Sequence, residues 1–394
     1  MRRAEGWRAS GRAEMSSLRI GVNALYLIPG GVGGTEIYLR CLLDALAEID
    51  DTNQYLIYTN RETGADLAPR RPNFSVAPQP VRAVLRPARI LWEQAGLPLV
   101  VRRHRMDVLF NPGFTVPIIC PCPTVTVFHD LQHKRHPEYF RWFDLPFWRL
   151  LLWLAAHRST RLLAVSEATR ADLFRYYKIP AEKVRVVQHG VESRFFDIGR
   201  LRREADIEPY LLAVSTLHPH KNLERLIRAF AEFRRVRPEF RLVIAGLRGF
   251  HTSAVEQLIA SLGLQGAVEL PGWVSREALA ALYQRAWAFM SPTLFEGFGM
   301  PVAEALAAGI PTACSAIEPV RSVAGSAALL FDPKSGADLL DAMVRISSDP
   351  DLRARLTIEG PRRASEFSWR KAASETLALI REAATSPLPL PQDR

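Results

Sequence analysis

Cysteine is scarce in this chain. The 394 residues contain four cysteines, at Cys41, Cys120, Cys122 and Cys314. They are too few and too scattered for a disulfide framework. The Cys120-Pro-Cys122 pair lacks the second ligand pair that a zinc site requires. We therefore expect four reduced thiols in a cytosolic protein.

Long hydrophobic runs are also missing, although 48% of the residues are hydrophobic. No apolar stretch reaches the roughly 18 to 20 residues that cross a bilayer. Residues 1–14 lack the apolar segment of a secretory signal, and Met15 follows them directly. We expect residues 1–14 to be an over-called start or a disordered extension. The proline-rich residues 385–394 are expected to form a flexible tail.

Acidic residues are scarce in one half of the chain only. Residues 1–196 contain 27 Lys and Arg against 18 Asp and Glu, whereas residues 197–394 contain 24 against 23. This asymmetry indicates either an anionic partner of the first half or an arginine-rich solvated surface. The basic clusters at 82–89 and 101–105 carry no nucleic-acid-binding motif, so no nucleic acid is expected. An anionic membrane surface and a phosphorylated acceptor both stay open.

Strand and helix patterns alternate in two series. The first has strand patterns at 18–25, 55–58, 108–110, 125–128, 162–165 and 184–187, and helical patterns at 35–48, 142–157 and 167–177. The second has strand patterns at 210–214, 242–245, 268–270, 288–290, 311–313 and 328–331, and helical patterns at 223–233, 253–262, 277–285, 301–308 and 337–347. This alternation predicts an α/β fold with parallel sheets and right-handed crossovers.

The two series predict two doubly wound, Rossmann-like domains that face each other across a cleft. We place the N-terminal domain at 15–195, a linker at 196–208 and the C-terminal domain at 209–367. An amphipathic helix at 368–384 is expected to pack back toward the N-terminal domain. Ligands of such sheets bind at the carboxyl ends of the strands.

Two glutamates, Glu296 and Glu304, stand in the otherwise apolar and glycine-rich stretch 293–310 (T-L-F-E-G-F-G-M-P-V-A-E-A-L-A-A-G-I). Proline suits the first turn of a helix, so we expect a helix from Pro301 that stops at Gly309. Glu296 then lies in the preceding loop, and Glu304 lies in the first turn, near the positive end of the helix dipole. Carboxylates beside a helix N-terminus can bind sugar or ribose hydroxyls. The stretch therefore predicts a ligand site.

Two further groups follow predicted strands. Lys221, in H-P-H-K-N (218–222), stands near a helix start, where a cation and the helix dipole can hold a diphosphate. His129 and Asp130 end the strand pattern T-V-F-H-D-L, at the edge that faces the cleft. We predict that His129 contacts a reacting group, with a purely structural role as the alternative.

Two segments leave their interpretation open. The glycine turn 30–36 (G-G-V-G-G-T-E) matches neither a P-loop nor a dinucleotide fingerprint. It fits a plain tight turn or a backbone cradle at the mouth of the cleft. The aromatic and apolar residues 142–158 have basic edges and fit either a core helix or an interfacial helix that dips into lipid. The segment H-D-L-Q-H-K-R-H lacks metal-ligand spacing, so no metal site is expected.

Together these motifs resemble the retaining glycosyltransferases of family 4, which have the GT-B fold. The resemblance runs from about Leu18 to about Ala383. F-E-G-F-G-M-P-V-A-E looks like the family's Glu-x7-Glu signature, supported by L-P-G-W-V-S and V-A-G-S-A-A-L-L-F-D-P. V-L-F-N-P-G-F-T, F-H-D-L and P-E-Y-F look like the branch that contains mannosyltransferases of O-antigen and exopolysaccharide assembly.

The resemblance implies roles for individual residues. On the donor side it implies that the sugar is bound by Glu296, Gly297, Phe298, Gly299 and Met300. It implies that Glu304 binds the ribose and Lys221 the diphosphate. The base is implied to lie at Trp273 and Val274. On the other side it implies Gly33 and Gly34 near the phosphates, His129 against the transferred sugar, and Thr35, Glu36 and Asp130 near the acceptor. His129, Lys221 and Glu296 are the implied catalytic residues.

One departure from the family pattern concerns charge. Many members pair the lysine with an arginine, but the equivalent places here hold Ser215, Thr216 and His220. Thr216, His220 or a base from elsewhere is expected to take over this role in donor binding.

The sequence therefore predicts a glycosyltransferase that needs neither metal nor cofactor. It is expected to move a hexose from GDP-mannose or another NDP-sugar to a lipid-linked or polysaccharide acceptor, and mannose is the first candidate for this hexose. We expect a cytoplasmic location and leave open peripheral binding at the inner face of the plasma membrane. The alternatives are a nucleotide-sugar epimerase, a phosphorylase, or a non-catalytic nucleotide-sugar-binding scaffold.

Overall fold

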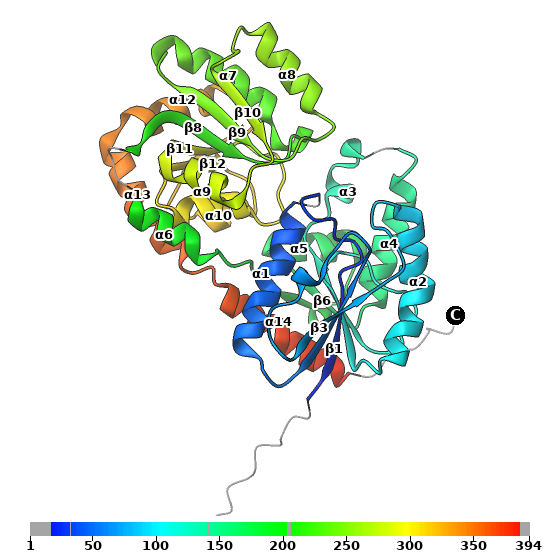
Figure 1. Ribbon diagram of the computed structural model, residues 1–394. Helices are drawn as coiled ribbons and strands as arrows, with labels where there is room; N and C mark the ends of the chain where they lie inside the picture. The colour runs from blue at the N-terminus through cyan, green and yellow to red at the C-terminus, as the bar shows by residue number, and fades with distance from the viewer. Residues whose placement is uncertain (1–16, 32, 141, 203–205, 387–394) are drawn as a thin grey trace, which may run out of the picture.

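Two parallel sheets organise the chain (Figure 1). The structure is a computed structural model and describes residues 17–31, 33–140, 142–202 and 206–386. The predicted extension at 1–14 and residues 387–394 of the predicted tail lie outside the described residues. Among the helices of the described ranges, none combines the length and apolar content that crossing a bilayer requires.

The N-terminal sheet has seven strands in the order β3-β2-β1-β4-β5-β6-β7. Their bounds are β1 Arg19–Asn23, β2 Gln54–Thr59, β3 Phe74–Pro78, β4 Val108–Asn111, β5 Thr124–Phe128, β6 Arg161–Ala164 and β7 Val184–Val186. The helices are α1 Gly34–Ile49, α2 Arg86–Arg103, α3 Gln132–Arg135, α4 Leu145–Arg158 and α5 Glu167–Asp172, with short turns at η1 Ala65–Leu67, η2 Pro137–Tyr139 and η4 Ala181–Lys183 and a π-helical segment, η3 Leu173–Tyr177, after α5.

The C-terminal sheet has six strands in the order β10-β9-β8-β11-β12-β13. Their bounds are β8 Glu208–Val214, β9 Arg241–Ala245, β10 Val268–Gly272, β11 Ala286–Ser291, β12 Thr312–Ser315 and β13 Leu329–Phe331. The helices are α6 Ser193–Leu201, α7 Leu223–Val236, α8 Thr252–Ser261, α9 Arg276–Arg285, α10 Met300–Ala307, α11 Val320–Ala324, α12 Gly336–Ser348, α13 Pro350–Ala364 and α14 Trp369–Ala384, with a short turn, η6 Pro219–Lys221, before α7.

The predicted α/β class and the two Rossmann-like sheets are confirmed. Six elements were not predicted: β3, α2, α3, α6, α11 and α13. The two long helices among them contain an internal proline, Pro98 in α2 and Pro361 in α13, which breaks the sequence pattern of a continuous helix. The segment predicted as a linker begins inside α6, which is helical to Leu201. Residues 203–205 of that segment lie outside the described residues.

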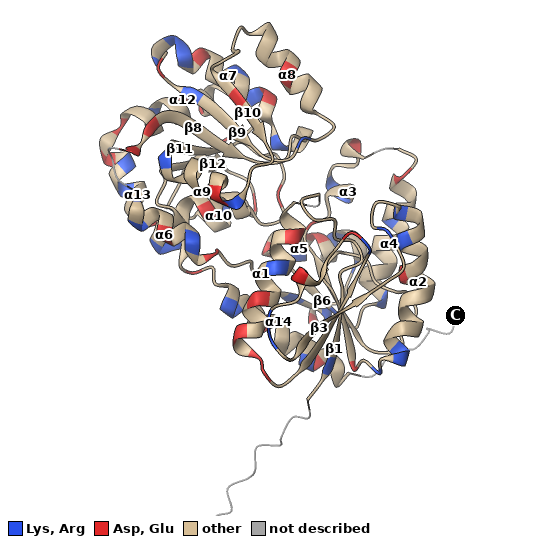
Figure 2. Cartoon of the chain, viewed as in Figure 1, with Lys and Arg blue, Asp and Glu red and all other residues tan. Residues whose placement is uncertain are grey.

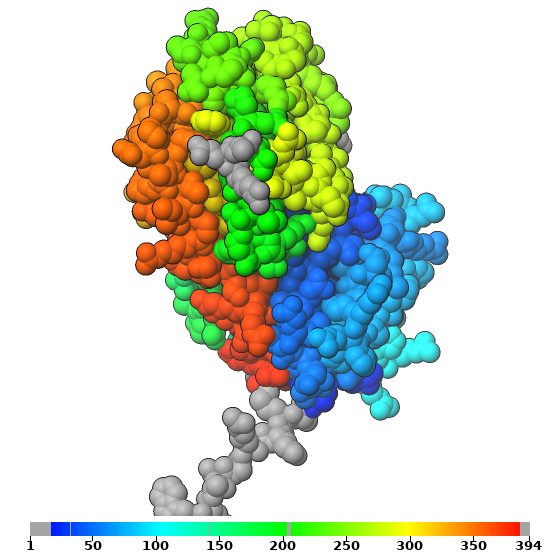
Figure 3. All heavy atoms as spheres, turned by 60° about the vertical axis from the view of Figure 1, so that its left-hand side comes forward, coloured from blue at the N-terminus to red at the C-terminus, as the bar shows by residue number. Residues whose placement is uncertain are grey.

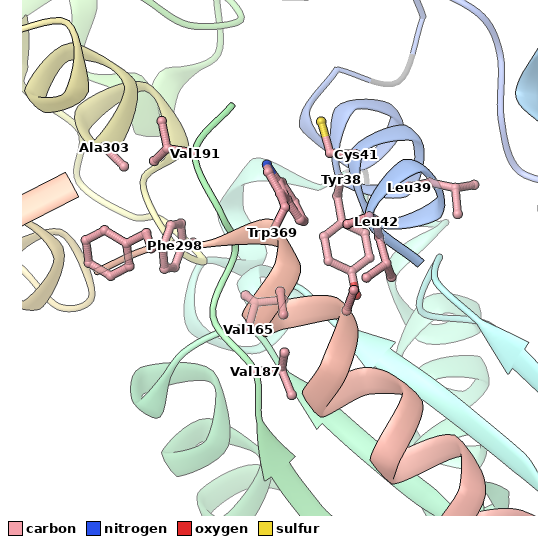
Figure 4. Packing of buried hydrophobic residues seen from close by; sticks show 14 of the residues in the cluster. Tyr38, Leu39, Cys41, Leu42, Val165, Val187, Val191, Phe298, Ala303 and Trp369 are labelled. Atoms are coloured by element: carbon pink, nitrogen blue, oxygen red, sulfur yellow. The ribbon is translucent and has the colours of Figure 1, made fainter. Parts of the chain in front are cut away.

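The last helix returns to the first domain. Figure 3 shows the C-terminal residues (red) against the N-terminal ones (blue), and α14 packs on α1 and on β5. The rings of Trp369 in α14 and Tyr38 in α1 lie 5.9 Å apart, and Phe298 lies 5.6 Å from Phe367. Figure 4 shows Trp369 between Tyr38 on one side and Phe298 on the other. One continuous hydrophobic core therefore joins the two sheets.

Two chain segments cross at this junction. The amide of Val191 donates a hydrogen bond to the Phe367 carbonyl oxygen over 3.1 Å. A Cβ atom at Gly190 would lie only 2.1 Å from the backbone nitrogen of Trp369. Glycine is therefore required at position 190 for the two segments to approach each other.

We expect Gly190→Ala to destabilise the fold by about 2 kcal/mol, the usual cost of forcing extra volume into a packed interior. Thermal unfolding of the full chain measures the effect as a lower Tm. Gly336→Ala is the matched control, because a Cβ atom there meets nothing within 4 Å. Equal Tm values for the two variants would contradict the crowding at this crossing.

Candidate active site

The signature stretch forms the loop after β11 and the start of α10. Gly299 precedes the helix with a φ of 103°, Pro301 is in its first turn, and Gly309 follows the helix with a φ of 62°. These conformations favour glycine and explain why the helix begins and ends where the sequence predicts. Glu304 lies in the second turn, so its expected place in the first turn was wrong by about one residue.

Glu296 and Lys221 form an ion pair. The Lys221 Nζ lies 2.5 Å from the Glu296 Oε1, and the two side chains are 17% and 16% exposed. Lys221 ends the η6 turn after β8, and Glu296 lies in the loop after β11, so two neighbouring strands deliver the pair to the carboxyl edge of the sheet. The structure thus brings together two of the three residues predicted to be catalytic.

Neighbouring side chains hold these two loops in register. The Asn222 side-chain amide donates hydrogen bonds to the carbonyls of Pro292 and Pro333. The His220 carbonyl accepts from the Leu294 amide over 2.7 Å and from the Thr293 hydroxyl over 3.1 Å. A cavity of about 10 Å³ lies beside the ion pair, room for about one water molecule. No sequence pattern indicated this role for Asn222, because its partners are remote in the chain.

The Glu304 side chain faces α9. It is 8% exposed, and its Oε2 accepts a hydrogen bond of 3.0 Å from the Tyr283 hydroxyl of α9. Burial raises the pKa of Glu304 to about 7, while the bond from Tyr283 lowers it. Glu304 is not among the residues that line the cavity beside Lys221. Its predicted contact with a ribose stays a prediction.

His220 carries no positive charge in this structure, so its expected replacement of the missing arginine stays a prediction. Burial and the nearby Lys221 lower its pKa to about 2, so the ring is neutral. Its Nδ1 lies 2.9 Å from the amide nitrogen of Gln132 in α3 and accepts its hydrogen bond. This bond crosses between the domains. Thr216, the other expected substitute, is half-buried after β8.

The N-terminal domain meets the signature loop at Gly297. A Cβ atom at Gly297 would lie 2.1 Å from the His129 carbonyl oxygen and 3.4 Å from the Cβ of Asp130. Two residues of α3 and the loop after it, Arg135 and His136, lie 5.7 Å and 5.3 Å from the ring of Phe295. This short helix therefore belongs to the domain interface, a role the sequence did not indicate.

His129 is buried, and its imidazole is held by its own domain. Nε2 lies 2.8 Å from the Pro112 carbonyl oxygen, and the ring packs on Tyr38 and Phe114. Burial lowers the pKa of His129 to about 4, so the ring is neutral and Nε2–H donates to Pro112. The backbone of His129, rather than its ring, contacts Gly297. The predicted contact of His129 with the transferred sugar stays a prediction.

Asp130 lies at the same edge. Burial and the nearby Glu296 raise its pKa to about 6, while the Gln132 amide and Lys221 lower it. Asp130 therefore belongs to the same charge cluster as the Lys221–Glu296 pair.

The remaining predicted residues lie in the glycine turn, at the start of α1, and in the loop after β10. Gly33 has a φ of 61°, and a Cβ atom there would lie 3.8 Å from Leu247, so the glycine turn reaches the other domain. Glu36 accepts from the Gly30 amide and pairs with Arg40, which gives it a structural task inside the turn. Gly34 is exposed and Thr35 half-buried at the start of α1. Trp273 is 54% exposed and Val274 half-buried after β10.

Comparison with known families shows which family the chain belongs to. Residues 32–195 match the family model "Glycosyltransferase Family 4", and residues 199–363 match the model "Glycosyl transferases group 1". The chain is a family 4 glycosyltransferase. The predicted family and enzyme class are thereby confirmed.

This glycosyltransferase is similar to several curated proteins along most of its length. It is 26% identical over 302 residues to the O-antigen chain mannosyltransferase B of Escherichia coli, covering 75% of this chain and 77% of that protein. It is 29% identical over 324 residues to the MMP alpha-(1->4)-mannosyltransferase of Mycolicibacterium hassiacum, covering 78% and 76%.

Solved structures resemble it in fold. Sucrose-phosphate synthase from Thermosynechococcus elongatus superposes with a TM-score of 0.77 at 20% identity and covers 93% of this chain and 98% of its own. WaaG, a glycosyltransferase involved in lipopolysaccharide biosynthesis, superposes with a TM-score of 0.72 at 17% identity, covering 92% and 99%. The fold of the glycosyltransferase is thus GT-B.

The raised pKa of Glu304 predicts a pH dependence of stability. Its pKa is about 7 in the folded protein against 4.5 normally. The folded state therefore holds a proton that the unfolded state loses, and stability falls as the pH rises from about 4.5 to about 7. We expect Glu304→Gln to remove this fall, so that its Tm exceeds the wild-type Tm most at pH 8.

Thermal unfolding at pH 5 and pH 8 measures this difference. Glu182→Gln, at an exposed glutamate of the N-terminal domain, is the control and is expected to follow the wild type. A Glu304→Gln variant with the same loss of Tm as the wild type between the two pH values would contradict the assignment.

Proposed function

We propose that this glycosyltransferase moves a hexose from a nucleoside diphosphate sugar to a lipid-linked saccharide or polysaccharide acceptor. Mannose is the hexose that we propose. The relatives named as mannosyltransferases support the sugar. Another relative, at 28% identity, is the O-antigen chain mannosyltransferase RfbU of Salmonella typhimurium, and it supports the acceptor class. We propose that transfer takes place in the cytoplasm.

The Lys221–Glu296 pair is the observation that carries the proposal. A diphosphate with two or more negative charges competes with Glu296 for the Lys221 ammonium. Once Lys221 binds the diphosphate, the Glu296 carboxylate is free to accept hydrogen bonds from hydroxyls of the donor sugar. We propose that the free amides at the start of α10, including those of Gly299 and Met300, bind the same ligand. Donor binding therefore exchanges one set of charge contacts for another.

Transfer breaks the bond between the anomeric carbon and the diphosphate oxygen and forms a bond from that carbon to the acceptor hydroxyl oxygen. We propose attack on the face from which the diphosphate leaves, so that the configuration is retained and a diphosphate oxygen takes the acceptor proton. Negative charge grows on the leaving diphosphate, and Lys221 with the α10 N-terminus stabilises it. Asp130 lies close enough to this cluster to accept from an acceptor hydroxyl.

Four other contacts complete the proposed donor site. Glu304 is proposed to bind the ribose through the carboxylate oxygen that Tyr283 leaves unused. The base is proposed to lie along the backbone near Trp273 and Val274, beyond the end of β10. Gly33 and Gly34 are proposed to approach the phosphates from the N-terminal domain, and His129 to approach the sugar.

We expect Lys221→Met to lower kcat/KM for transfer on the order of 10²- to 10³-fold, the usual effect of removing one charge-stabilising group. Glu296→Ala is expected to abolish transfer. Released nucleoside diphosphate is measured with a donor panel that includes GDP-mannose and UDP-glucose, with and without acceptor. Lys334→Met, at an exposed lysine of the same domain, is the control.

Wild-type activity in Glu296→Ala would overturn the site. Binding of every donor without any release of diphosphate would favour the scaffold alternative. Release from a UDP-sugar and not from GDP-mannose would overturn the proposed donor while leaving the reaction class intact.

We propose that transfer needs no metal ion. Among the described residues, no group of three or more His, Cys, Asp or Glu side chains is arranged to hold one. Lys221 and the α10 N-terminus are the proposed counter-charges for the diphosphate. Excess EDTA is therefore expected to leave the initial rate unchanged, and a loss of rate that Mg²⁺ or Mn²⁺ restores would contradict this.

A further inference from the structure

Exposed large hydrophobic side chains gather in one part of the chain. Sixteen are exposed among the described residues, and ten of these lie between residues 84 and 153. The ten are Val84, Leu85, Leu91, Leu99, Ile119, Trp142, Phe143, Phe147, Leu150 and Trp153. A concentration of this kind marks an interaction surface, whereas scattered exposed side chains do not.

Helix α4 is apolar on two faces. Leu151, Leu152 and Ala155 are buried against the sheet. Phe147, Leu150 and Trp153 are 51%, 57% and 42% exposed. Their spacing of three residues places them on one outward face of the helix. The segment 142–158 is therefore both a core helix and a helix with an exposed aromatic face, which joins the two alternatives that the sequence left open.

Helix α2 presents a second exposed stripe. Leu91 and Leu99 are both 69% exposed and are eight residues apart, which places them on the same face. Arg102 and Arg103 are exposed in the last turn of this helix.

Acidic groups are almost absent from the α2 region. Residues 80–105 contain six arginines, of which all but the buried Arg89 are exposed, and one acidic residue, Glu93. Glu93 is 1% exposed and accepts from Asn23 over 2.8 Å and Thr115 over 2.7 Å, so it does not offset the arginines at the surface. The surface around α2 is apolar and cationic.

The two helices lie side by side on one face of the N-terminal sheet (Figure 1). α2 leads from β3 to β4 and α4 from β5 to β6, in the same direction along the sheet order, so right-handed crossovers place both on the same side. The Arg86 guanidinium at the start of α2 lies 5.3 Å from the centre of the Trp148 ring of α4. Figure 2 shows basic segments on both helices. Their outer faces form one surface.

We propose that this surface, made of α2, α4, the residues 142–143 that precede α4, residues 84–85 and Ile119, docks on an anionic lipid bilayer. Exposed Trp and Phe side chains suit the boundary between lipid headgroups and acyl chains, where their rings are partly in contact with hydrocarbon. Arginines beside them attract anionic headgroups. A protein partner or a second copy of the chain would need acidic groups to match the arginines of α2.

The surface begins at the edge of the sheet that carries the candidate active site. Helices that follow strands begin at the carboxyl edge of the sheet, so the starts of α2 and α4 lie on the side of Asp130 and the signature loop. Docking would bring this edge of the sheet, with the candidate active site, toward the lipid headgroups. The inference concerns where the protein binds and is independent of the sugar that it transfers.

Flotation of the full-length protein with vesicles tests the proposal. We expect flotation with vesicles of phosphatidylglycerol and phosphatidylcholine, and much weaker flotation with phosphatidylcholine alone or at high salt. The triple variant Trp142→Ser, Phe147→Ser and Leu150→Ser is expected to lower partitioning on the order of 100-fold. Arg102→Gln with Arg103→Gln is expected to lower it about 25-fold, since each basic residue contributes about fivefold.

Matched controls exist in the C-terminal domain. Phe250→Ser with Ile358→Ser removes two side chains that are 69% and 74% exposed, and Arg234→Gln with Arg235→Gln removes two arginines from the last turn of α7. Both controls are expected to float like the wild type. All variants are expected to keep the Tm and the donor hydrolysis rate of the wild type.

Three results would overturn the proposal. The first is no flotation of the wild type, and the second is equal binding to neutral and anionic vesicles. The third is a dimer, measured by light scattering, that the triple apolar variant dissociates while the wild type fails to float. Since the vesicles contain no sugar, none of these results bears on the transfer reaction.

Discussion

The ion pair between Lys221 and Glu296 is the interaction on which the rest of the site depends. Each partner stands at the end of a neighbouring parallel strand, and each is only partly reached by water. A charge removed from water in this way needs a partner, because an unpaired one would cost several kcal/mol. The pair therefore holds two loops in place at the carboxyl edge of the sheet. In the proposed function it connects the architecture of the sheet to the binding of a diphosphate.

Much of this architecture could be predicted from local patterns. The alternation of strands and helices is enough to predict two Rossmann-like sheets, and the proline and glycines around α10 fix where that helix begins and ends. Helices α2 and α13 were missed because Pro98 and Pro361 lie inside them, where the surrounding packing outweighs local preference. A helix that continues through an internal proline is stabilised by contacts with other parts of the chain, and the sequence of the helix alone does not show these contacts.

The candidate site was predictable in its residue types but not in their orientations. Glu304 turns toward Tyr283, His129 toward Pro112, and His220 toward Gln132. Each of these partners is 17 to 88 positions away in the chain. A motif indicates that a carboxylate or imidazole is present, but the direction it faces is set by the fold. The low pKa of His220 follows first from burial and then from Lys221, and the burial could not be inferred from its neighbours in sequence.

Gly297 lets the backbones of the two domains come within touching distance, because a Cβ atom there would lie 2.1 Å from the His129 carbonyl oxygen. Any side chain at position 297 would therefore hold the signature loop away from the N-terminal domain. The spacing between the two domains at the candidate site is thus set by the absence of a single methyl group.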